Sequence, residues 1–197
     1  MAKARYHHGD LPRMLVEAAI VHLKDHDAST LGLRPLAKVV GVSEAAPYHH
    51  FTDRRAFEHA VMIEGYALLR ARCLAVAPQS LRDLLDAYVG FAVEHPNLFR
   101  LIHRSGEARD PANAALAAAS EAAFAPLLAE VRRRAQMAGV CEADRIGFLA
   151  LMVWTQVHGL AEVVISDFLR LGADGASFRE RAYAYIEAGL RTALTAD

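Results

Sequence analysis

The stretch from Leu33 to Phe51, with the sequence LRPLAKVVGVSEAAPYHHF, constrains the fold of this chain more than any other. Its first apolar residues recur at helical spacing, Gly41-Val42-Ser43 interrupts the pattern, and a second helical segment is predicted from Glu44. Gly41 can adopt the positive φ that ends a helix, and Ser43 is a good N-cap for the next helix. The stretch therefore predicts a helix-turn-helix, a motif whose second helix enters the major groove of DNA.

Pro47 indicates that this second helix is short and irregular at its start. With Ser43 as the N-cap, Pro47 lacks the N–H that would donate the first intrahelical bond to the Ser43 carbonyl. Ala45 and Ala46 offer only apolar contacts, for example to a thymine methyl group. We therefore expect His49 and the backbone to carry much of any base reading.

The same stretch resembles the DNA-binding signature of the TetR family of bacterial transcription regulators. The residues that carry the resemblance are Leu36-Ala37, Gly41-Val42-Ser43, Tyr48-His49-His50-Phe51, Arg54 and Phe57. It implies base contacts from the start of the second helix, phosphate contacts from polar groups around it, and packing of Phe51 in the head. The DNA-binding residues predicted in this way are Arg34, Ser43, Glu44, Ala45, Ala46, Tyr48, His49, His50 and Arg54.

Charge gives this interpretation modest support. The whole chain has a net charge of −1, so it is not a general polyanion binder. Residues 1–55 carry eight Lys and Arg against six Asp and Glu, together with six of the ten histidines. The rest of the chain carries 14 basic against 17 acidic residues, so the N-terminal quarter is the better candidate for a DNA face.

Along the rest of the chain the sequence shows signals for helices and no pattern typical of strands. Asp53 is predicted to cap a long helix over 54–76, and Ala77-Pro78-Gln79-Ser80 forms the clearest boundary, with Ser80 capping the next helix. These patterns predict an all-α fold of about nine helices, with an N-terminal three-helix head on a C-terminal antiparallel helical bundle. The predicted domains are a DNA-binding domain at 1–53, a connecting helix at 54–76, and a ligand-binding and dimerisation domain at 77–197.

Four further boundaries can be tested against the structure. The first helix is predicted to end near Asp27, and Asp110-Pro111 to start an alanine-rich helix. Pro126 is expected to kink or divide that helix. Ser177-Phe178-Arg179-Glu180 reads as a capping box that starts the last helix.

The C-terminal part resembles a class of TetR C-terminal domains marked by Trp-x-x-x-His-Gly. Here the motif is Trp154 to Gly159, and Glu94 to Arg100 resembles a second region of that class. Trp154 and His158, spaced i and i+4, share one helix face. The resemblance implies a small-molecule pocket, although a packed core with satisfied histidines remains the alternative for each residue. The predicted ligand-binding residues are Tyr88, Phe91, His95, Phe99, His103, Trp154 and His158.

The resemblance also implies a homodimer, because two heads related by two-fold symmetry can reach two half-sites on DNA. The family's dimer surface lies on the last two long helices. Small and apolar positions there would allow close helix approach. They are Gly159, Val163, Ala182, Ile186, Gly189 and Ala193.

The function implied is that of a ligand-responsive DNA-binding transcriptional regulator, a repressor released from its double-stranded DNA operator by a small-molecule effector, and not an enzyme. Two alternatives stay open, a helical protein-interaction adaptor without DNA binding and a helical-bundle metalloenzyme. The second is disfavoured because the sequence contains no Glu-x-x-His, His-Glu-x-x-His or Gly-x-Ser-x-Gly motif.

No metal or other cofactor is expected. His22 and His26 are spaced i and i+4, and His95, His103 and His158 could converge, but no cysteine or carboxylate cluster accompanies them. No run of about 18 apolar residues lacks a charge, and the first ten residues have no apolar segment. We therefore expect a cytoplasmic protein without membrane association, with Cys73 and Cys141 as reduced, buried or half-buried thiols.

Overall fold

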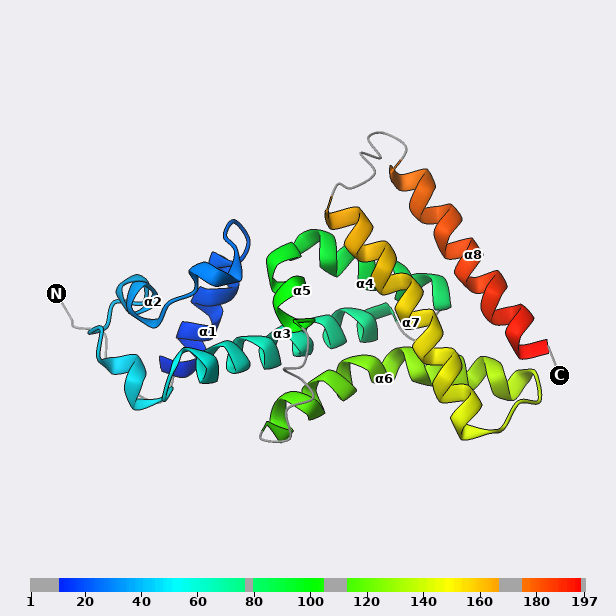
Figure 1. The fold of residues 1–197 in the computed structure, drawn as a ribbon, viewed down its shortest axis with the longest axis horizontal. Coiled ribbons are helices and arrows are strands. Elements are labelled where there is room, and N and C mark those ends of the chain that lie inside the picture. Colours follow the sequence, from blue (N-terminus) through cyan, green and yellow to red (C-terminus); the bar gives the residue numbers. More distant parts are fainter. Residues whose placement is uncertain (1–10, 77–79, 105–112, 167–174, 196–197) are drawn as a thin grey trace. The chain divides into compact units, whose positions relative to one another are not determined.

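The computed structural model describes residues 11–76, 80–104, 113–166 and 175–195 (Figure 1). Within these ranges the chain forms eight α-helices, two short 3-10 helices and no strand, which confirms the predicted all-α class. The elements are α1 (Leu11–His22), η2 (Ala28–Thr30), α2 (Leu33–Val39), η3 (Ala46–His49), α3 (Arg54–Val76), α4 (Leu81–Glu94), α5 (Pro96–Ile102), α6 (Ala114–Met137), α7 (Ala143–Ile165) and α8 (Gly175–Thr195).

The chain forms two compact units, and α3 contributes to both. The first unit comprises Met1–Gly65 and Asn97–Ala117, and the second comprises Tyr66–Pro96 and Ala118–Asp197. The first therefore contains the predicted head together with nearly all of α5. The functional division into 1–53, 54–76 and 77–197 stays a prediction.

Short polar side chains set the starts of three helices. The Ala56 amide donates to the Asp53 carboxylate at 2.7 Å, and the Asp83 amide donates to the Ser80 hydroxyl at 3.2 Å, so both predicted caps are confirmed. The Leu116 amide donates to the Asn113 side chain at 3.1 Å. Asn113 thus caps α6, while the predicted Asp110-Pro111 start lies outside the described residues.

The sequence-based boundaries of α1 and α8 were wrong, and so was the division of α6. α1 ends at His22 rather than near Asp27, because the amides of Lys24 and Asp25 bond three residues back and tighten the chain into turns. α8 begins at Gly175, so Ser177 lies inside the helix and does not cap it. α6 runs through buried Pro126 as one helix, so Pro126 does not divide it, and the kink expected there stays a prediction.

The first unit has a core drawn from several short elements. Apolar faces of α1, α2, α3 and α5 supply its side chains. Gly65 allows close approach between α3 and α5, because a Cβ there would lie 2.7 Å from Ile102 and 3.0 Å from Leu98. The Asn97 side chain donates to the Leu23 carbonyl at 3.1 Å, which ties α5 to the end of α1. α5 is therefore an integral part of the first unit.

Glu58 is a buried carboxylate in the first unit, with 7% of its side chain exposed. It accepts from Arg54 Nε at 2.6 Å and from Arg104 Nη2 at 2.7 Å. Arg54 Nη2 also donates to the carbonyls of Ala28 at 3.0 Å and Ser29 at 2.9 Å. The Glu58 carboxylate thus joins the start of α3 to Arg104, two residues after α5, and Arg54 extends this network to η2.

In the second unit, α4, α7 and α8 pack against one another. Their buried faces include Leu85, Phe91, Val153, Val157 and Tyr183. Arg82 on α4 pairs with Glu180 and Glu187 on α8, and Glu187 also lies 3.7 Å from Arg134 on α6. These ion pairs connect α4, α6 and α8 at the edge of the apolar core.

α6 and α7 are each long and apolar enough to cross a membrane by length and composition alone. The sequence analysis expected no spanning helix. α7 packs against α4 and α8 and buries Ile146, Leu149, Val153, Val157 and Leu160. Core helices of helical bundles share this composition, so the apolar character of α7 agrees with its place in the second unit.

The two cysteines differ in exposure. Cys73 on α3 is buried, and burial raises the pKa of its thiol to about 11, so the unreactive thiol form dominates at neutral pH. Cys141 is exposed, which corrects the expectation that both thiols are buried or half-buried.

Replacement of Glu58 by Gln is expected to lower the free energy of unfolding by about 1–3 kcal/mol, because the amide keeps the size of the side chain but loses the charge shared by Arg54 and Arg104. The matched control is Glu17→Gln, which removes the exposed Arg13–Glu17 pair and is expected to cost less than about 0.5 kcal/mol. Urea unfolding followed by circular dichroism measures both. Equal, small changes would contradict a stabilising role of Glu58.

Candidate nucleic-acid interface and effector region

The turn between α2 and η3 is a Schellman motif. The Val42 amide donates to the Ala37 carbonyl at 2.9 Å, and the Gly41 amide donates to the Lys38 carbonyl at 3.2 Å. Gly41 has φ of 79°, which confirms the positive φ predicted for it. This hydrogen-bonded turn fixes the direction in which the chain leaves α2.

The recognition segment is a single 3-10 turn, η3, and not an α-helix. The Tyr48 amide donates to the Ala45 carbonyl at 3.2 Å, and the His50 amide donates to the Pro47 carbonyl at 3.0 Å. Pro47 has no amide to bond to Ser43, so the tighter pattern replaces the α-helical one. The expected shortness is confirmed, but Ser43 is not the N-cap, because η3 begins at Ala46 after Ala45.

One face of this segment is buried and the other is exposed. Pro47 and Phe51 are buried, and the Phe51 ring meets Phe57 edge-on at 5.1 Å, which confirms the packing role predicted for Phe51. Tyr48 is 47% exposed. The predicted DNA-binding residues exposed beside it are Ser43, Glu44, Ala45, His49 and His50, with Ala46 half-buried. The segment therefore presents small, hydroxyl and imidazole side chains to solvent.

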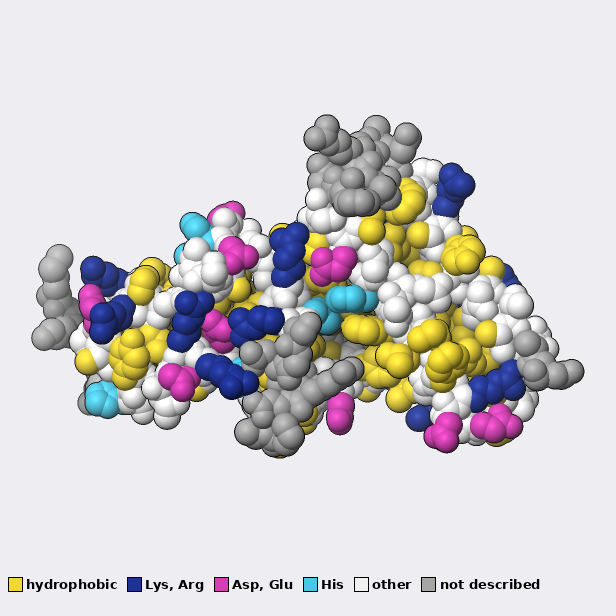
Figure 2. All heavy atoms as spheres, viewed as in Figure 1, with side chains coloured by type: hydrophobic (Ala, Val, Ile, Leu, Met, Phe, Trp, Pro, Cys, Tyr) yellow, Lys and Arg dark blue, Asp and Glu magenta, His cyan; other side chains and the backbone are white. Residues whose placement is uncertain are grey.

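Two basic side chains lie on the exposed side of α2. Arg34, predicted from the sequence, is exposed in the first turn. Lys38, one turn later, is also exposed, and its ammonium lies 3.9 Å from the Glu44 carboxylate. The sequence analysis missed Lys38, although its i, i+4 spacing from Arg34 was a readable signal. Figure 2 shows Lys and Arg side chains spread over the visible face of the first unit.

Arg54 has contacts inside the first unit that the sequence did not reveal. Its guanidinium donates to Glu58 and to two carbonyls of η2, as described above. These bonds orient Arg54 but occupy only part of its five N–H donors. Its assignment to DNA phosphate stays a prediction.

His22, the last residue of α1, and His26, four residues later, form a local contact. The rings of His22 and His26 stack at 4.3 Å, and His22 Nε2 lies 2.8 Å from the Thr30 hydroxyl. His26 Nδ1 lies 3.1 Å from the His22 carbonyl. Within the described ranges, no group of three or more His, Cys, Asp or Glu side chains is placed to hold a metal ion.

In the second unit, Tyr88, Trp154 and His158 come together from α4 and α7. The Tyr88 hydroxyl lies 3.0 Å from His158 Nδ1, and the Trp154 and His158 rings stack at 4.9 Å with 16° between their planes. Tyr88 is buried, whereas Trp154 and His158 are half-buried. We call these three side chains the aromatic triad. They combine apolar faces with polar tips, as small-molecule sites require.

Burial changes the acid-base behaviour of the triad. It raises the pKa of Tyr88 well above its ordinary value, so the phenol keeps its proton. It also lowers the pKa of His158, although the nearby Glu162 carboxylate partly opposes this shift. In the neutral tautomer with its proton on Nε2, His158 accepts a hydrogen bond from the Tyr88 hydroxyl at Nδ1. The sequence analysis did not single out Glu162, which lies one turn after His158.

The other predicted ligand-binding residues form two separate pairs. Phe91 and His95 lie in the second unit, with ring centroids 5.1 Å apart. Phe99 and His103 lie in the first unit, with ring centroids 4.4 Å apart, and His103 Nδ1 lies 2.9 Å from the Phe99 carbonyl. The structure therefore brings three of the predicted residues into the triad, and the part of the other four in a ligand site stays a prediction.

α7 and α8 carry exposed apolar side chains. Phe148 is 58% exposed, Leu151 47% and Tyr185 75%. Gly159 and Gly189, both predicted at the dimer surface, are exposed with open space above their Cα atoms, whereas Ile186 is buried in the core. Figure 2 shows hydrophobic surface gathered over α7. The sequence did not single out the three exposed side chains, because periodicity alone does not say which apolar residues face solvent.

Comparison with known proteins gives one family and a set of similar structures. Residues 81–185 match the family model described as the Tetracyclin repressor-like, C-terminal domain. The chain is similar to the structure of a protein of unknown function from Rhodococcus sp. RHA1, with 27% identity and a TM-score of 0.72, over 98% of this chain and 97% of that one. Among curated proteins, none matches the chain significantly.

A second similar structure is that of the TetR family transcriptional regulator PfmR from Thermus thermophilus. The identity is 22% and the TM-score 0.61, over 90% of this chain and 97% of that one, so this likeness concerns the fold. The family model covers more than half of the chain, runs from α4 into α8, and includes all three members of the aromatic triad. The chain belongs to the TetR family of transcriptional regulators.

Proposed function

We propose that this chain is a ligand-responsive, DNA-binding transcriptional regulator that acts as a repressor and leaves its operator when a small molecule binds. The observation that carries the DNA-binding part is the exposed edge from Ser43 to His50, held by the Schellman turn on one side and by buried Pro47 and Phe51 on the other. A rigid turn with an exposed polar edge is what base reading in a groove requires.

Within this edge, each group has a distinct role. His49, with Glu44, Ala45 and Ala46, contacts base edges, and Tyr48 and His50 contact the phosphate backbone. Arg34 adds a phosphate contact from α2. Lys38 makes a further phosphate contact when the Glu44 side chain leaves it and turns to the DNA. Phosphate contacts set affinity and register, whereas base contacts set sequence preference.

The effector site we propose is built around the aromatic triad. The effector stacks on Trp154 and exchanges hydrogen bonds with His158 and Tyr88. To regulate, it must bind the DNA-releasing form more tightly than the DNA-bound form, since equal affinity for both forms shifts nothing. A coupling free energy of about 1–3 kcal/mol corresponds to a weakening of operator binding by about 5–150-fold.

The acting species we propose is a cytoplasmic homodimer without enzymatic activity. The exposed apolar side chains of α7 and α8 support dimerisation, because contiguous exposed apolar surface is typical of protein interfaces. Open space above Gly159 and Gly189 admits a close partner helix.

DNA binding is tested by fluorescence anisotropy with fragments that flank the gene, across a series of salt concentrations. His49→Ala is expected to weaken binding to the specific site by about 1–3 kcal/mol per half-site and to leave non-specific binding unchanged. Arg34→Ala is expected to weaken binding to all sequences. It should also reduce the slope of the logarithm of the binding constant against the logarithm of the salt concentration by about one per protomer.

The control for both variants is Arg132→Ala, which removes an exposed arginine of α6 in the second unit and should leave binding unchanged. If the wild-type protein shows no salt-dependent, sequence-specific binding, the regulator proposal fails. A helical adaptor that binds only protein would give that result.

Tyr185→Asp and Phe148→Asp are each expected to convert the dimer to a monomer, because a carboxylate replaces a large exposed side chain in a desolvated interface. Val93→Asp is the matched control, since Val93 is 47% exposed on α4 and should tolerate the change without loss of the dimer. Light scattering during gel filtration gives the masses. A wild-type monomer, or aspartate variants that stay dimeric, would rule out this interface.

The lowered pKa of His158 predicts a defined pH dependence of stability. The folded-state pKa lies below the unfolded value of about 6.5, so the unfolded chain binds more protons as pH falls through that value, and stability is lost on acidification. His158→Gln is expected to lose stability less steeply between about pH 7.5 and pH 5. Urea unfolding at several pH values measures the difference, and identical slopes would show that His158 is not buried in its neutral form.

A further inference from the structure

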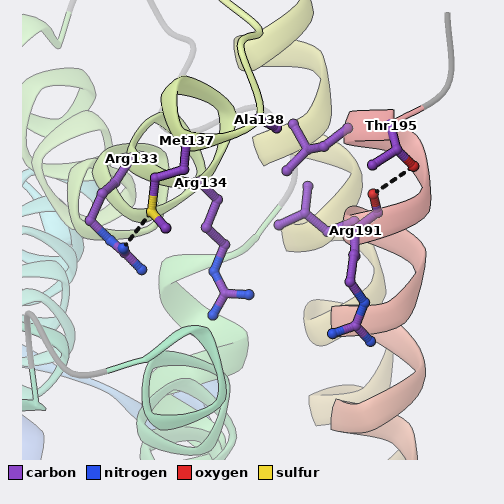
Figure 3. Close-up of a pocket in the computed structure, with 8 residues that line it drawn as sticks. Arg133, Arg134, Met137, Ala138, Arg191 and Thr195 are labelled. Atoms are coloured by element: carbon purple, nitrogen blue, oxygen red, sulfur yellow. Dashed lines mark hydrogen bonds between the residues drawn. The ribbon is translucent and has the colours of Figure 1, made fainter.

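A cavity of about 290 Å³ lies between the C-terminal ends of α6 and α8, within the second unit (Figure 3). Its lining is apolar at the floor and basic at the rim. The residues are Arg133, Arg134, Met137, Ala138, Leu190, Arg191, Leu194 and Thr195. We call it the α6–α8 cavity. Its volume is close to the lower limit of about 300–1,000 Å³ typical of small-molecule sites.

Among the described lining residues, the rim carries three arginines and no carboxylate. Arg133 and Arg134 share Glu130, outside the lining, at 2.8 and 2.7 Å. Within the described ranges no ion pair forms at Arg191, and Figure 3 shows its side chain and that of Arg134 extending from facing helices. Arg134 also lies 3.7 Å from the Glu187 carboxylate. Among the described residues, Arg191 is therefore the rim arginine that is available to an anion.

Arginines near helix C-termini often serve to neutralise the last carbonyls. Here that role on α8 is already filled, because Arg145 Nη2 donates to the Ala193 carbonyl at 3.0 Å. In the part of the chain that the structure describes, the hydrogen bond of Arg133 Nη1 goes to the Met137 sulfur, a weak acceptor, at 3.2 Å. A carboxylate would be a better partner for both Arg133 and Arg191.

The floor requires a different chemistry from the rim. Leu190 and Leu194 are buried in the second unit, and Met137 is 77% exposed beside them, so its flexible thioether can fold over a bound chain. An aliphatic tail fits such a floor, whereas a small inorganic anion would leave it unfilled.

We propose that the α6–α8 cavity binds an amphipathic monoanion, a carboxylate with an aliphatic tail of medium length such as octanoate. The tail lies on Leu190, Leu194 and Met137, and the carboxylate bonds to Arg191 at the rim. This site is separate from the aromatic triad, shares no residue with it, and does not depend on the DNA-binding proposal.

The test uses sodium octanoate and octan-1-ol, which have the same tail length but differ in charge, titrated into the full-length protein in a calorimeter. Octanoate is expected to bind once per protomer, and octan-1-ol at least about tenfold more weakly. Arg191→Gln is expected to weaken octanoate by about tenfold or more, and Met137→Glu to abolish binding by placing a carboxylate at the rim. Both side chains are exposed, so neither change should prevent folding.

The matched control is Arg132→Gln, which removes an exposed arginine next to the rim that does not line the cavity and should leave octanoate affinity within about twofold. Absence of octanoate binding, equal affinity for octan-1-ol, or full affinity in Arg191→Gln would each overturn the proposal. Loss of octanoate binding in Trp154→Phe with full affinity in Arg191→Gln would place octanoate at the aromatic triad and overturn it as well.

Discussion

The carboxylate of Glu58 is the interaction on which the first unit depends. It is buried, and it pairs with the guanidiniums of Arg54, at the start of α3, and Arg104, two residues after α5. Through Arg54 it also fixes the carbonyls of η2, which immediately precedes α2. A buried carboxylate without such partners would be strongly destabilising, so these segments must form together. The exposed edge from Ser43 to His50 therefore rests on residues far from it in the sequence.

Local signals in the sequence predicted the end of α2 and the starts of α3 and α4 correctly. Gly41 ended α2, and Asp53 and Ser80 capped α3 and α4, because each acts on backbone groups within a few residues. The capping role predicted for Ser43 was wrong, although it also rested on a local signal. Its capping role was assigned on the assumption of an α-helix, and the missing amide of Pro47 moved the start of the segment to Ala46.

Contacts between distant residues were harder to predict. Trp154 and His158 could be placed on one helix face by spacing, but nothing in the sequence ranked Tyr88 above Phe91 as their partner. Arg104 offered no signal that it would reach Glu58, 46 residues away. The α6–α8 cavity depends on how the ends of two helices meet, which periodicity does not encode. The family resemblance predicted the class of function, whereas the side-chain contacts, such as Tyr88 with His158 and Arg104 with Glu58, became known only from the structure.

The length of η3 limits how much sequence information one protomer can read. A 3-10 helix rises about 2.0 Å per residue, so its four residues span about 8 Å, or roughly two to three base-pair steps of about 3.4 Å. Two such segments would define about five base pairs, a combination that recurs by chance about once per thousand positions of random DNA. In the proposed homodimer, discrimination within a genome would therefore come from the distance between the two heads and from the shape of the DNA between them. For this protein, the geometry of the dimer would contribute as much to operator recognition as the side chains that contact bases.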